Sequence, residues 1–476
     1  MPKRTLLLAL TLLLSLNAFG KGRILIVNAD GPNVGLNDPT PAAPVGGNPG
    51  TTLGQQRLNV LEYAAAKWSG LIDLDLNIIA RSAFAPIPGC TATEGVLGQA
   101  GPFAWQRDFA NAPHARTWYP IALANQLAGR DINGDSPEIF VRFNADVDKQ
   151  TCLGDSDWYY GFDGNAGNDS DLYHVVLHEL AHGLGVAGAD RAPVFANGFP
   201  SVSDLHTYDV STGLRWDQMS QADRTKSHTN TGNLVWDGPN VREHANWYLR
   251  PVTMLSVSEP STIARSYDVG TAAAFGAPIS TTPMSGKIVR VADAANTDGA
   301  SATDGCTAFT NAAAINGNVA LVDRGNCTYV AKARNAQAAG ATGLIVADHL
   351  RETCQPPSMG GEATDITIPV ISVGATDGDV LKGALSANAN VQASLRTDSG
   401  QLAGASKEGY VRVYAPCTDD PGSSTRHWDV VATPNLLMEP FINSDLTDGV
   451  DLTLFQLFDI GWKPAVRTGR GAGRGR

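Results

Sequence analysis

Two histidines and a glutamate in one short apolar segment carry the most specific chemistry of this chain. The segment Val175–Gly185 reads VVLHELAHGLG, with His178 and His182 four residues apart and Glu179 directly after the first. Residues four apart share one face of a helix, so both imidazoles can bind one metal ion. Glu179 would lie beside that ion, where it can take a proton from a metal-bound water. The spacing predicts a zinc-binding helix rather than a helix with two ordinary surface histidines.

A third protein ligand must come from outside this helix, because catalytic zinc has three protein ligands and one open position for water. Gly183 and Gly185 favour an end of the helix close after His182, where the chain can turn away. From the residues alone, several candidates for the third ligand stay open: His206, His228, His244, His349, His427, Asp190, Asp204 and Asp209.

The pattern His-Glu-x-x-His-x-x-Gly resembles that of the metzincin metallopeptidases. Most metzincins place the third ligand three residues after the glycine, and that position is Gly188 here, which has no side chain to coordinate a metal. The stretch Gly422–Pro440 resembles the leishmanolysin type of metzincin, in which a long insertion separates the zinc helix from a His-Trp pair and a Leu-Met-x-Pro turn. The matching residues are His427-Trp428 and Leu437-Met438-Glu439-Pro440. This resemblance implies His427 as third ligand, with Asp204 or His206 as nearer alternatives, and Met438 as the Met-turn residue under the metal.

Apolar patterns predict the elements that position these residues. Residues 57–71 have helical spacing, residues 74–80 and 138–144 read as strands, and a Gly-, Asn- and Asp-rich loop spans 161–171. Ser170 is the expected N-cap of a helix that begins at Asp171, and residues 452–457 read as a short terminal helix. The expected fold class is α+β: a metzincin-like zinc peptidase domain with a mixed sheet and an active-site helix, interrupted by a small domain. The sheet edge would bind an extended peptide as an added strand.

The interrupting segment is Ala- and Gly-rich, with short strands expected at 319–322, 344–347 and 368–373 and a helix at 330–339. Residues 318–349, NVALVDRGNCTYVAKARNAQAAGATGLIVADH, together with 368–372, resemble the protease-associated (PA) domain. The resemblance implies a non-catalytic module that binds or gates substrates, and it disfavours His349 as a ligand. The expected organisation is a signal peptide at 1–20, a metallopeptidase domain at 21–282 and 398–463, the PA insert at 283–397, and a Gly/Arg-rich tail at 464–476.

The first twenty residues indicate export. A basic start, an apolar run at 6–16 and the sequence Ala18-Phe19-Gly20 form the pattern of a cleaved signal peptide. The run is shorter than the ~20 residues of a bilayer span, and no other stretch reads as one. A secreted or periplasmic location lets thiols oxidise, so the six cysteines, none of them in a CxxC pair, predict disulfides. Proximity in the sequence favours Cys306 with Cys327.

Composition limits the function further. Of the 476 residues, 43% are hydrophobic and 17% are charged, and the formal net charge is −12, which argues against a nucleic-acid partner. Two acidic loops could hold Ca²⁺, Asp131-Ile-Asn133-Gly-Asp135 and residues 163–171. The first lacks the later glutamate of an EF-hand and reads better as a solvated turn.

We therefore expect a secreted zinc-dependent endopeptidase that hydrolyses protein or peptide substrates with a zinc-activated water. One catalytic Zn²⁺ would be bound by His178, His182 and His427, and Glu179 would act as general base and then as proton donor. Two alternatives stay open. One is a catalytically silent peptide-binding or adhesion protein on the same fold, and the other is a zinc amidase acting on cell-wall peptides. The sequence indicates no oligomeric state.

Overall fold

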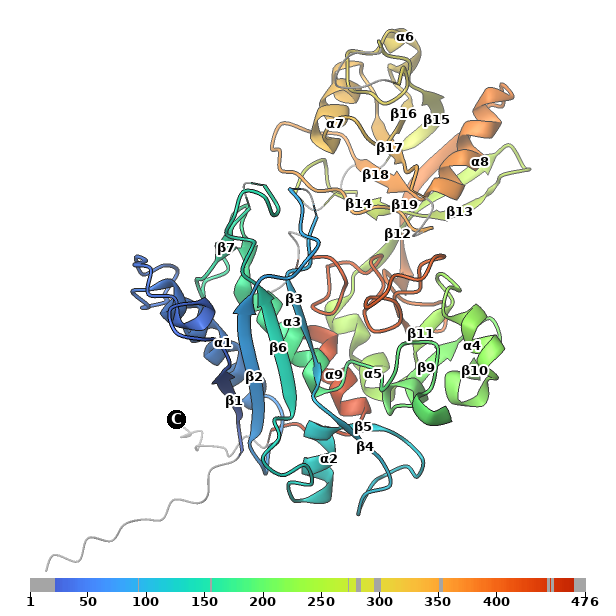
Figure 1. Ribbon diagram of the computed structural model, residues 1–476. Coiled ribbons are helices and arrows are strands. Elements are labelled where there is room, and N and C mark those ends of the chain that lie inside the picture. The colour runs from blue at the N-terminus through green and yellow to red at the C-terminus, as the bar shows by residue number, and fades with distance from the viewer. Residues whose placement is uncertain are drawn as a thin grey trace, which may run out of the picture.

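Two bodies of structure lie one above the other in Figure 1, and the chain passes from the lower to the upper and back again. The computed structural model describes residues 22–465 except 93, 155, 273, 280–283, 295–300, 351–353, 443–445 and 447–448. The expected signal peptide and nearly all of the expected Gly/Arg-rich tail lie outside these residues. Within the described ranges, the helices are too short or too polar to cross a membrane.

A four-stranded sheet forms the N-terminal part of the lower body. Its order is β1 (Ile24–Asn28), β2 (Ile78–Ala85), β6 (Ile139–Asn144) and β3 (Gly98–Pro102). The first three strands are parallel, and β3 runs antiparallel to β6 along the edge. The strand expected at 74–80 begins only at Ile78, because the Gln126 side chain accepts hydrogen bonds from the backbone N–H groups of Asp75 and Leu76.

Two long helices cover one side of this sheet. The first, α1 (Leu53–Ser69), contacts β1, and α3 (Leu172–Leu184) contacts β3 and β6. Trp68 is fully buried between the two helices and donates its Nε1–H to the carbonyl oxygen of Leu177 at 3.1 Å. The first helix begins four residues earlier than the apolar pattern predicts, because the Thr52 side chain accepts a hydrogen bond from the N–H of Gln55 and caps it.

Shorter elements complete the lower body. A second sheet, antiparallel throughout, has the order β10 (Leu214–Arg215), β9 (Thr207–Asp209), β11 (Leu234–Trp236) and β20 (Val411–Arg412). The shorter helices of the lower body are α2 (Ile121–Ala128), α4 (Gln221–Ser227), α5 (Pro239–Tyr248) and the terminal α9 (Asp451–Asp459). The lower body also contains two isolated strand pairs: β4 (Trp105–Gln106) with β5 (Tyr119–Pro120), and β7 (Trp158–Tyr159) with β8 (Ser170–Asp171). One hydrophobic core extends through the lower body from Ile24 to Trp462.

The upper body is built on an eight-stranded sheet with a core on each face. Along β16, Val319 and Leu321 belong to one core, and Ala320 and Val322 to the other. The strand order is β13 (Arg265–Asp268), β12 (Pro251–Glu259), β19 (Gln392–Leu402), β15 (Ser285–Arg290), β16 (Val319–Asp323), β17 (Gly343–Ala347), β18 (Val370–Val373) and β14 (Gly270–Thr271). Its helices are α6 (Ala312–Ile315), α7 (Tyr329–Ala338) and α8 (Ala375–Ser386). The expected strands and helix are present within two residues of their predicted ends.

The connection between the two bodies runs through the long strands β12 and β19, which pair antiparallel. The chain enters the upper sheet at residue 251 and leaves it at residue 402. The sheet therefore includes β12, β13 and β14, which come from the range 21–282 that the sequence analysis assigned to the peptidase domain.

All six cysteines form disulfides. The pair Cys306–Cys327, favoured by proximity in the sequence, is confirmed. The other two pairs are Cys90–Cys152, within the lower body, and Cys354–Cys417, which joins the upper body to the lower.

Candidate metal centre

Helix α3 carries the HELAH motif through the middle of the lower body. Asp171 caps it by accepting a hydrogen bond from the N–H of Tyr173 at 2.9 Å, so the expected N-cap Ser170 is wrong by one residue. The helix ends at Gly185, whose φ of 129° disfavours any side chain. Gly183 serves a different purpose: a Cβ there would lie 2.3 Å from Ile139 Cγ2, so this glycine lets the helix approach β6 closely.

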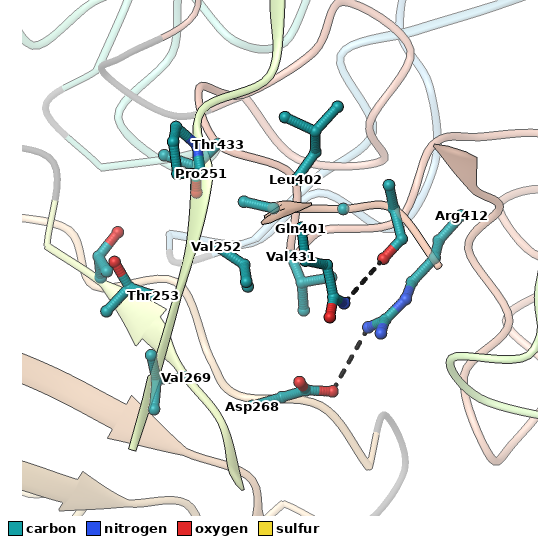
Figure 2. Close-up of a pocket in the computed structure, with 14 residues that line it drawn as sticks. Pro251, Val252, Thr253, Asp268, Val269, Gln401, Leu402, Arg412, Val431 and Thr433 are labelled. Carbon is teal, nitrogen blue, oxygen red and sulfur yellow. Dashed lines mark hydrogen bonds and ion pairs between the residues drawn. The ribbon is translucent and has the colours of Figure 1, made fainter. Parts of the chain in front are cut away.

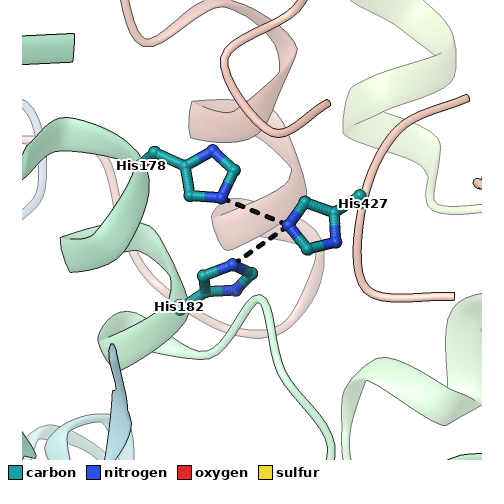
Figure 3. Close-up of side chains that lie close together, drawn as sticks. All are labelled: His178, His182 and His427. Carbon is teal, nitrogen blue, oxygen red and sulfur yellow. Dashed lines mark hydrogen bonds between the residues drawn. The ribbon is translucent and has the colours of Figure 1, made fainter. Parts of the chain in front are cut away.

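Three histidines converge at this helix, as Figure 3 shows. His178 and His182 come from α3, and His427 comes from the chain between β20 and α9. The Nε2 atom of His427 lies 3.2 Å from Nε2 of His178 and 3.2 Å from Nε2 of His182. Within the part of the chain that the structure describes, no other group of three or more His, Cys, Asp or Glu side chains is placed closely enough to bind one metal ion.

The other ring nitrogen of each histidine fixes its tautomer. Each Nδ1 lies within hydrogen-bond distance of a backbone carbonyl oxygen: Leu437 for His178 at 2.6 Å, Val186 for His182 at 2.7 Å and Ser423 for His427 at 2.8 Å. A carbonyl oxygen only accepts, so each Nδ1 donates and each Nε2 presents a lone pair to the other two. Three such lone pairs cannot hydrogen-bond to one another, and a metal cation would satisfy all of them.

Burial keeps these imidazoles neutral. It lowers the pKa of His178 to about 3 and that of His182 to about 4, and it holds the pKa of His427 well below its ordinary value. Neutral imidazole is the form that binds Zn²⁺. The donor set therefore fits a zinc ion with three histidine ligands and a fourth position for water.

Glu179 lies between the helix and the edge strand. Its side chain is buried, and burial raises the pKa of its carboxyl group to about 8 in the metal-free protein. A Cβ on Gly98, the first residue of β3, would lie 2.6 Å from Glu179 Oε1. The glycine thus makes room for the carboxylate directly beside the edge of the sheet.

The Leu437-Met438 turn touches both segments that bear the histidines. The Leu437 carbonyl oxygen accepts from His178 Nδ1, and the Met438 carbonyl oxygen accepts from the backbone N–H of Trp428 at 2.7 Å. The Met438 side chain is fully buried. The segment of His427 is fixed on its other side as well, because the His427 carbonyl oxygen accepts from the N–H of Tyr414 at 2.9 Å.

The space beside Gly188 is occupied by the side chain of Arg426, which belongs to the His427 segment. A Cβ on Gly188 would lie 2.0 Å from Arg426 Nη2, so the glycine leaves space for the guanidinium group. Arg426 Nη1 donates to Asp204 Oδ1 at 3.0 Å, with side chains 12% and 4% exposed. Asp204 Oδ2 in turn accepts from the N–H and Oγ–H of Ser201, both at 2.7 Å. Asp204, open from the sequence as a nearer ligand, thus binds Arg426 instead, and this ion pair was not anticipated.

The remaining candidates for a third ligand lie apart from the triad. His206 contacts the Asp459 carbonyl, His228 contacts Asp419, His244 contacts the Asn240 carbonyl, the His349 side chain is 58% exposed, and the carboxylates of Asp190 and Asp209 accept from the N–H groups of Arg191 and Ser211.

The acidic loops show turn contacts. Asp131 Oδ1 accepts from the N–H groups of Asn133 and Gly134, and Asp163 Oδ1 accepts from the Tyr159 hydroxyl. These bonds stabilise the loops themselves, and nothing in them supports a calcium site.

Comparison with known proteins identifies a domain within the upper body. Residues 284–381 match the family model of the PA domain. The curated relatives include the ER degradation-enhancing alpha-mannosidase-like protein 3 of Xenopus laevis (38% identical over 88 residues), the Signal peptide peptidase-like 2 of Arabidopsis thaliana (35% over 96 residues) and the Aminopeptidase YwaD of Bacillus subtilis (32% over 91 residues). These matches cover 17%, 19% and 19% of this chain and only 10%, 17% and 20% of the relatives.

A zinc aminopeptidase from Bacillus subtilis is among the similar solved structures. It is 23% identical and has a TM-score of 0.23, with 32% of this chain and 31% of that chain covered. The named relatives carry different activities, and each is matched over a small share of its length. The sequence matches to the curated relatives therefore describe one shared domain, and residues 284–381 of this chain form a PA domain.

Proposed function

We propose that this protein is a secreted zinc-dependent endopeptidase of metzincin type, with the PA domain inserted in its catalytic domain. The observation that carries the proposal is the convergence of three neutral Nε2 lone pairs beside a buried glutamate. His178, His182 and His427 would bind the ion, and Met438 would support the site from the turn that touches both ligand segments. The Leu-Met-x-Pro turn and the distant third histidine favour the leishmanolysin type.

Each residue has a separate task in the proposed hydrolysis. When bound, zinc would act as a Lewis acid that makes its water more acidic and polarises the substrate carbonyl. Glu179 accepts a proton from the attacking water and later gives it to the leaving amine. The backbone carbonyls that accept from the three Nδ1 atoms keep the imidazoles oriented.

The outer edge of strand β3 favours a substrate that binds as an extended peptide. β3 pairs with β6 on one side only, which leaves its outer edge without a strand partner in the four-stranded sheet. A peptide bound there as an added strand would pass Glu179 at Gly98. A substrate held along its backbone extends in both directions from the bond to be cut, so we infer internal cleavage rather than removal of single terminal residues.

The test is hydrolysis by the purified, zinc-loaded chain. A peptide mixture should be cut at internal bonds, as mass spectrometry of the products would show, and 1,10-phenanthroline should stop the reaction until zinc is restored. Glu179→Gln should keep the metal and lose at least ~100-fold in activity. His349→Ala, an exposed histidine of the upper body, is the matched control and should behave as wild type.

Three outcomes distinguish the alternatives. Zinc bound by the triad with no hydrolysis of any peptide would favour the silent binding protein. Cleavage confined to cell-wall peptides, with unmodified peptides left intact, would favour the amidase. Release of single N-terminal residues only would replace the endopeptidase by an aminopeptidase.

A further inference from the structure

A loop of the upper body is fastened to the segment that carries His427. Cys354 forms a disulfide with Cys417, ten positions before His427 in the chain. The next residue, Gln355, donates its Nε2–H groups to both carboxylate oxygens of Asp429, at 2.8 Å and 2.7 Å. Gln355 is 4% exposed and Asp429 is 1% exposed, so water does not replace this contact.

Asp429 belongs to the same segment as the candidate metal ligand His427. It lies two residues after His427, and its N–H donates to the Arg412 carbonyl at 3.1 Å. Its Oδ1 also accepts from the N–H of Val431 at 3.0 Å. The carboxylate therefore links the backbone N–H of Val431, two residues further along the chain, to the Gln355 amide of the upper body.

The loop is held by the PA sheet rather than by the lower body alone. Ser372 in β18 donates its hydroxyl to the carbonyl oxygen of Pro357 at 2.6 Å. A Cβ on Gly374, directly after β18, would lie 3.1 Å from the Cys354 carbonyl oxygen, so the loop packs against the end of this strand. The position of Gln355 thus follows the position of β18.

The interface between the two bodies also contains an ion pair and leaves little empty space. Figure 2 shows Arg412 of the lower body paired with Asp268 at the end of β13, at 3.4 Å. The cavity beside this pair, between β12, β19 and the chain at 431–433, has a volume of only about 40 Å³. That is room for a few water molecules and not for a peptide. Among the described residues, the contacts that dock the upper body on the lower one include the Arg412–Asp268 pair, the Cys354–Cys417 disulfide and the Gln355–Asp429 contact.

We propose that Gln355 is a positioning residue for the metal centre, through which the PA domain holds His427 in reach of His178 and His182. The inference rests on the proposed zinc site. It makes the PA domain part of the site's construction, so exchange of the insert for a short linker should weaken zinc binding. Groups that hydrogen-bond directly to a metal ligand affect metal affinity by about 10–100-fold, and Gln355 acts one contact further out, through Asp429.

The experiment measures zinc affinity of the full-length chain by competition with a chromogenic chelator, together with the absorption spectrum of the Co²⁺ form. Gln355→Ala should weaken zinc binding by about tenfold, the lower end of the range for direct partners of a ligand, and alter the Co²⁺ spectrum. Gln355→Glu should be worse, because it places a second carboxylate against the buried Asp429. Gln337→Ala is the matched control: this glutamine also joins two segments by hydrogen bonds, but both lie within the PA domain.

An exchange of the two side chains separates positioning from general loss of structure. In the double variant Gln355→Glu/Asp429→Asn the amide and the carboxylate trade places, so the hydrogen bond between them and the one from the N–H of Val431 can both form. This variant should bind zinc within about threefold of wild type, far better than the single Gln355→Glu variant. The exchange also decides the question if Gln355→Glu alone fails to fold.

The inference would be overturned if Gln355→Ala and the exchanged pair both had the same zinc affinity and the same Co²⁺ spectrum as Gln337→Ala. An exchanged pair as weak as Gln355→Ala would also overturn it. A wild-type chain that binds no zinc would instead refute the proposed function itself, so the two failures are distinguishable.

Discussion

Replacement of Arg426 by alanine tests how the third histidine is brought to the helix. The guanidinium group of Arg426 lies over Gly188 and pairs with the buried Asp204. Arg426→Ala leaves the Asp204 carboxylate buried with only its two hydrogen bonds from Ser201. Removal of one partner of a buried pair costs about 3–5 kcal/mol, and we expect the lower end, about 3 kcal/mol, because Ser201 still satisfies one carboxylate oxygen.

Part of this loss should appear as weaker zinc binding. Arg426 directly precedes His427, so release of its side chain frees the ligand segment on one side. If half of the lost free energy acts on the placement of His427, zinc affinity falls about tenfold, since about 1.4 kcal/mol corresponds to a factor of ten. Chelator competition measures the affinity, and urea unfolding of the metal-free protein measures the stability.

The matched control is Arg334→Ala. Arg334 also pairs with an aspartate, Asp365, but the two side chains are 53% and 56% exposed and lie in the PA domain. Solvent screens an exposed pair of this kind, so its loss should hardly change stability, and zinc affinity should not change. Equal stability and equal zinc affinity of the two variants would refute the role that we give to Arg426.

Three further predictions follow from the same contacts. Gly98→Ala should lower peptidase turnover at least about tenfold with zinc content unchanged, because the methyl group would lie 2.6 Å from Glu179 Oε1 and displace the proposed base. Gly383→Ala, with open space around it, is the control. Equal turnover of the two variants would contradict this prediction. Burial raises the pKa of Glu179 from 4.5 to about 8, so the unfolded chain loses this proton first and the metal-free protein should lose stability as the pH rises between these values. Glu179→Gln should therefore raise the thermal midpoint of the metal-free protein near pH ~8.5 more than near pH ~5, and a uniform shift would count against the buried carboxylate. Non-reducing mass spectrometry should find all six cysteines oxidised, and free thiols at Cys354 and Cys417 would remove the covalent tether between the two bodies.

The helix that carries the HELAH motif could be predicted from the sequence because its signal is local. Helical spacing alone puts His178 and His182 on one face, and the structure places both side chains as expected. The edge strand β3 could not be predicted in the same way. Its sequence, Gly98–Pro102, has little side-chain pattern, and it forms a strand because its backbone pairs with β6.

Features that depend on distant contacts were harder to predict. The residues alone left five histidines and several aspartates as candidates for the third ligand, and only the resemblance singled out His427. The pair Cys306–Cys327 is 21 residues apart and could be expected from proximity, whereas Cys354 and Cys417 are 63 apart and meet only when the two bodies dock. No sequence pattern indicated that Arg426 would occupy the space over Gly188, since that contact depends on the packing of two segments far apart in the chain.

The metal itself gives the most direct test of the central claim. Anomalous diffraction at the zinc edge, on crystals of the zinc-loaded protein, should show one ion within about 2.0–2.1 Å of the Nε2 atoms of His178, His182 and His427. An ion bound elsewhere, with the three imidazoles left without metal, would contradict the account.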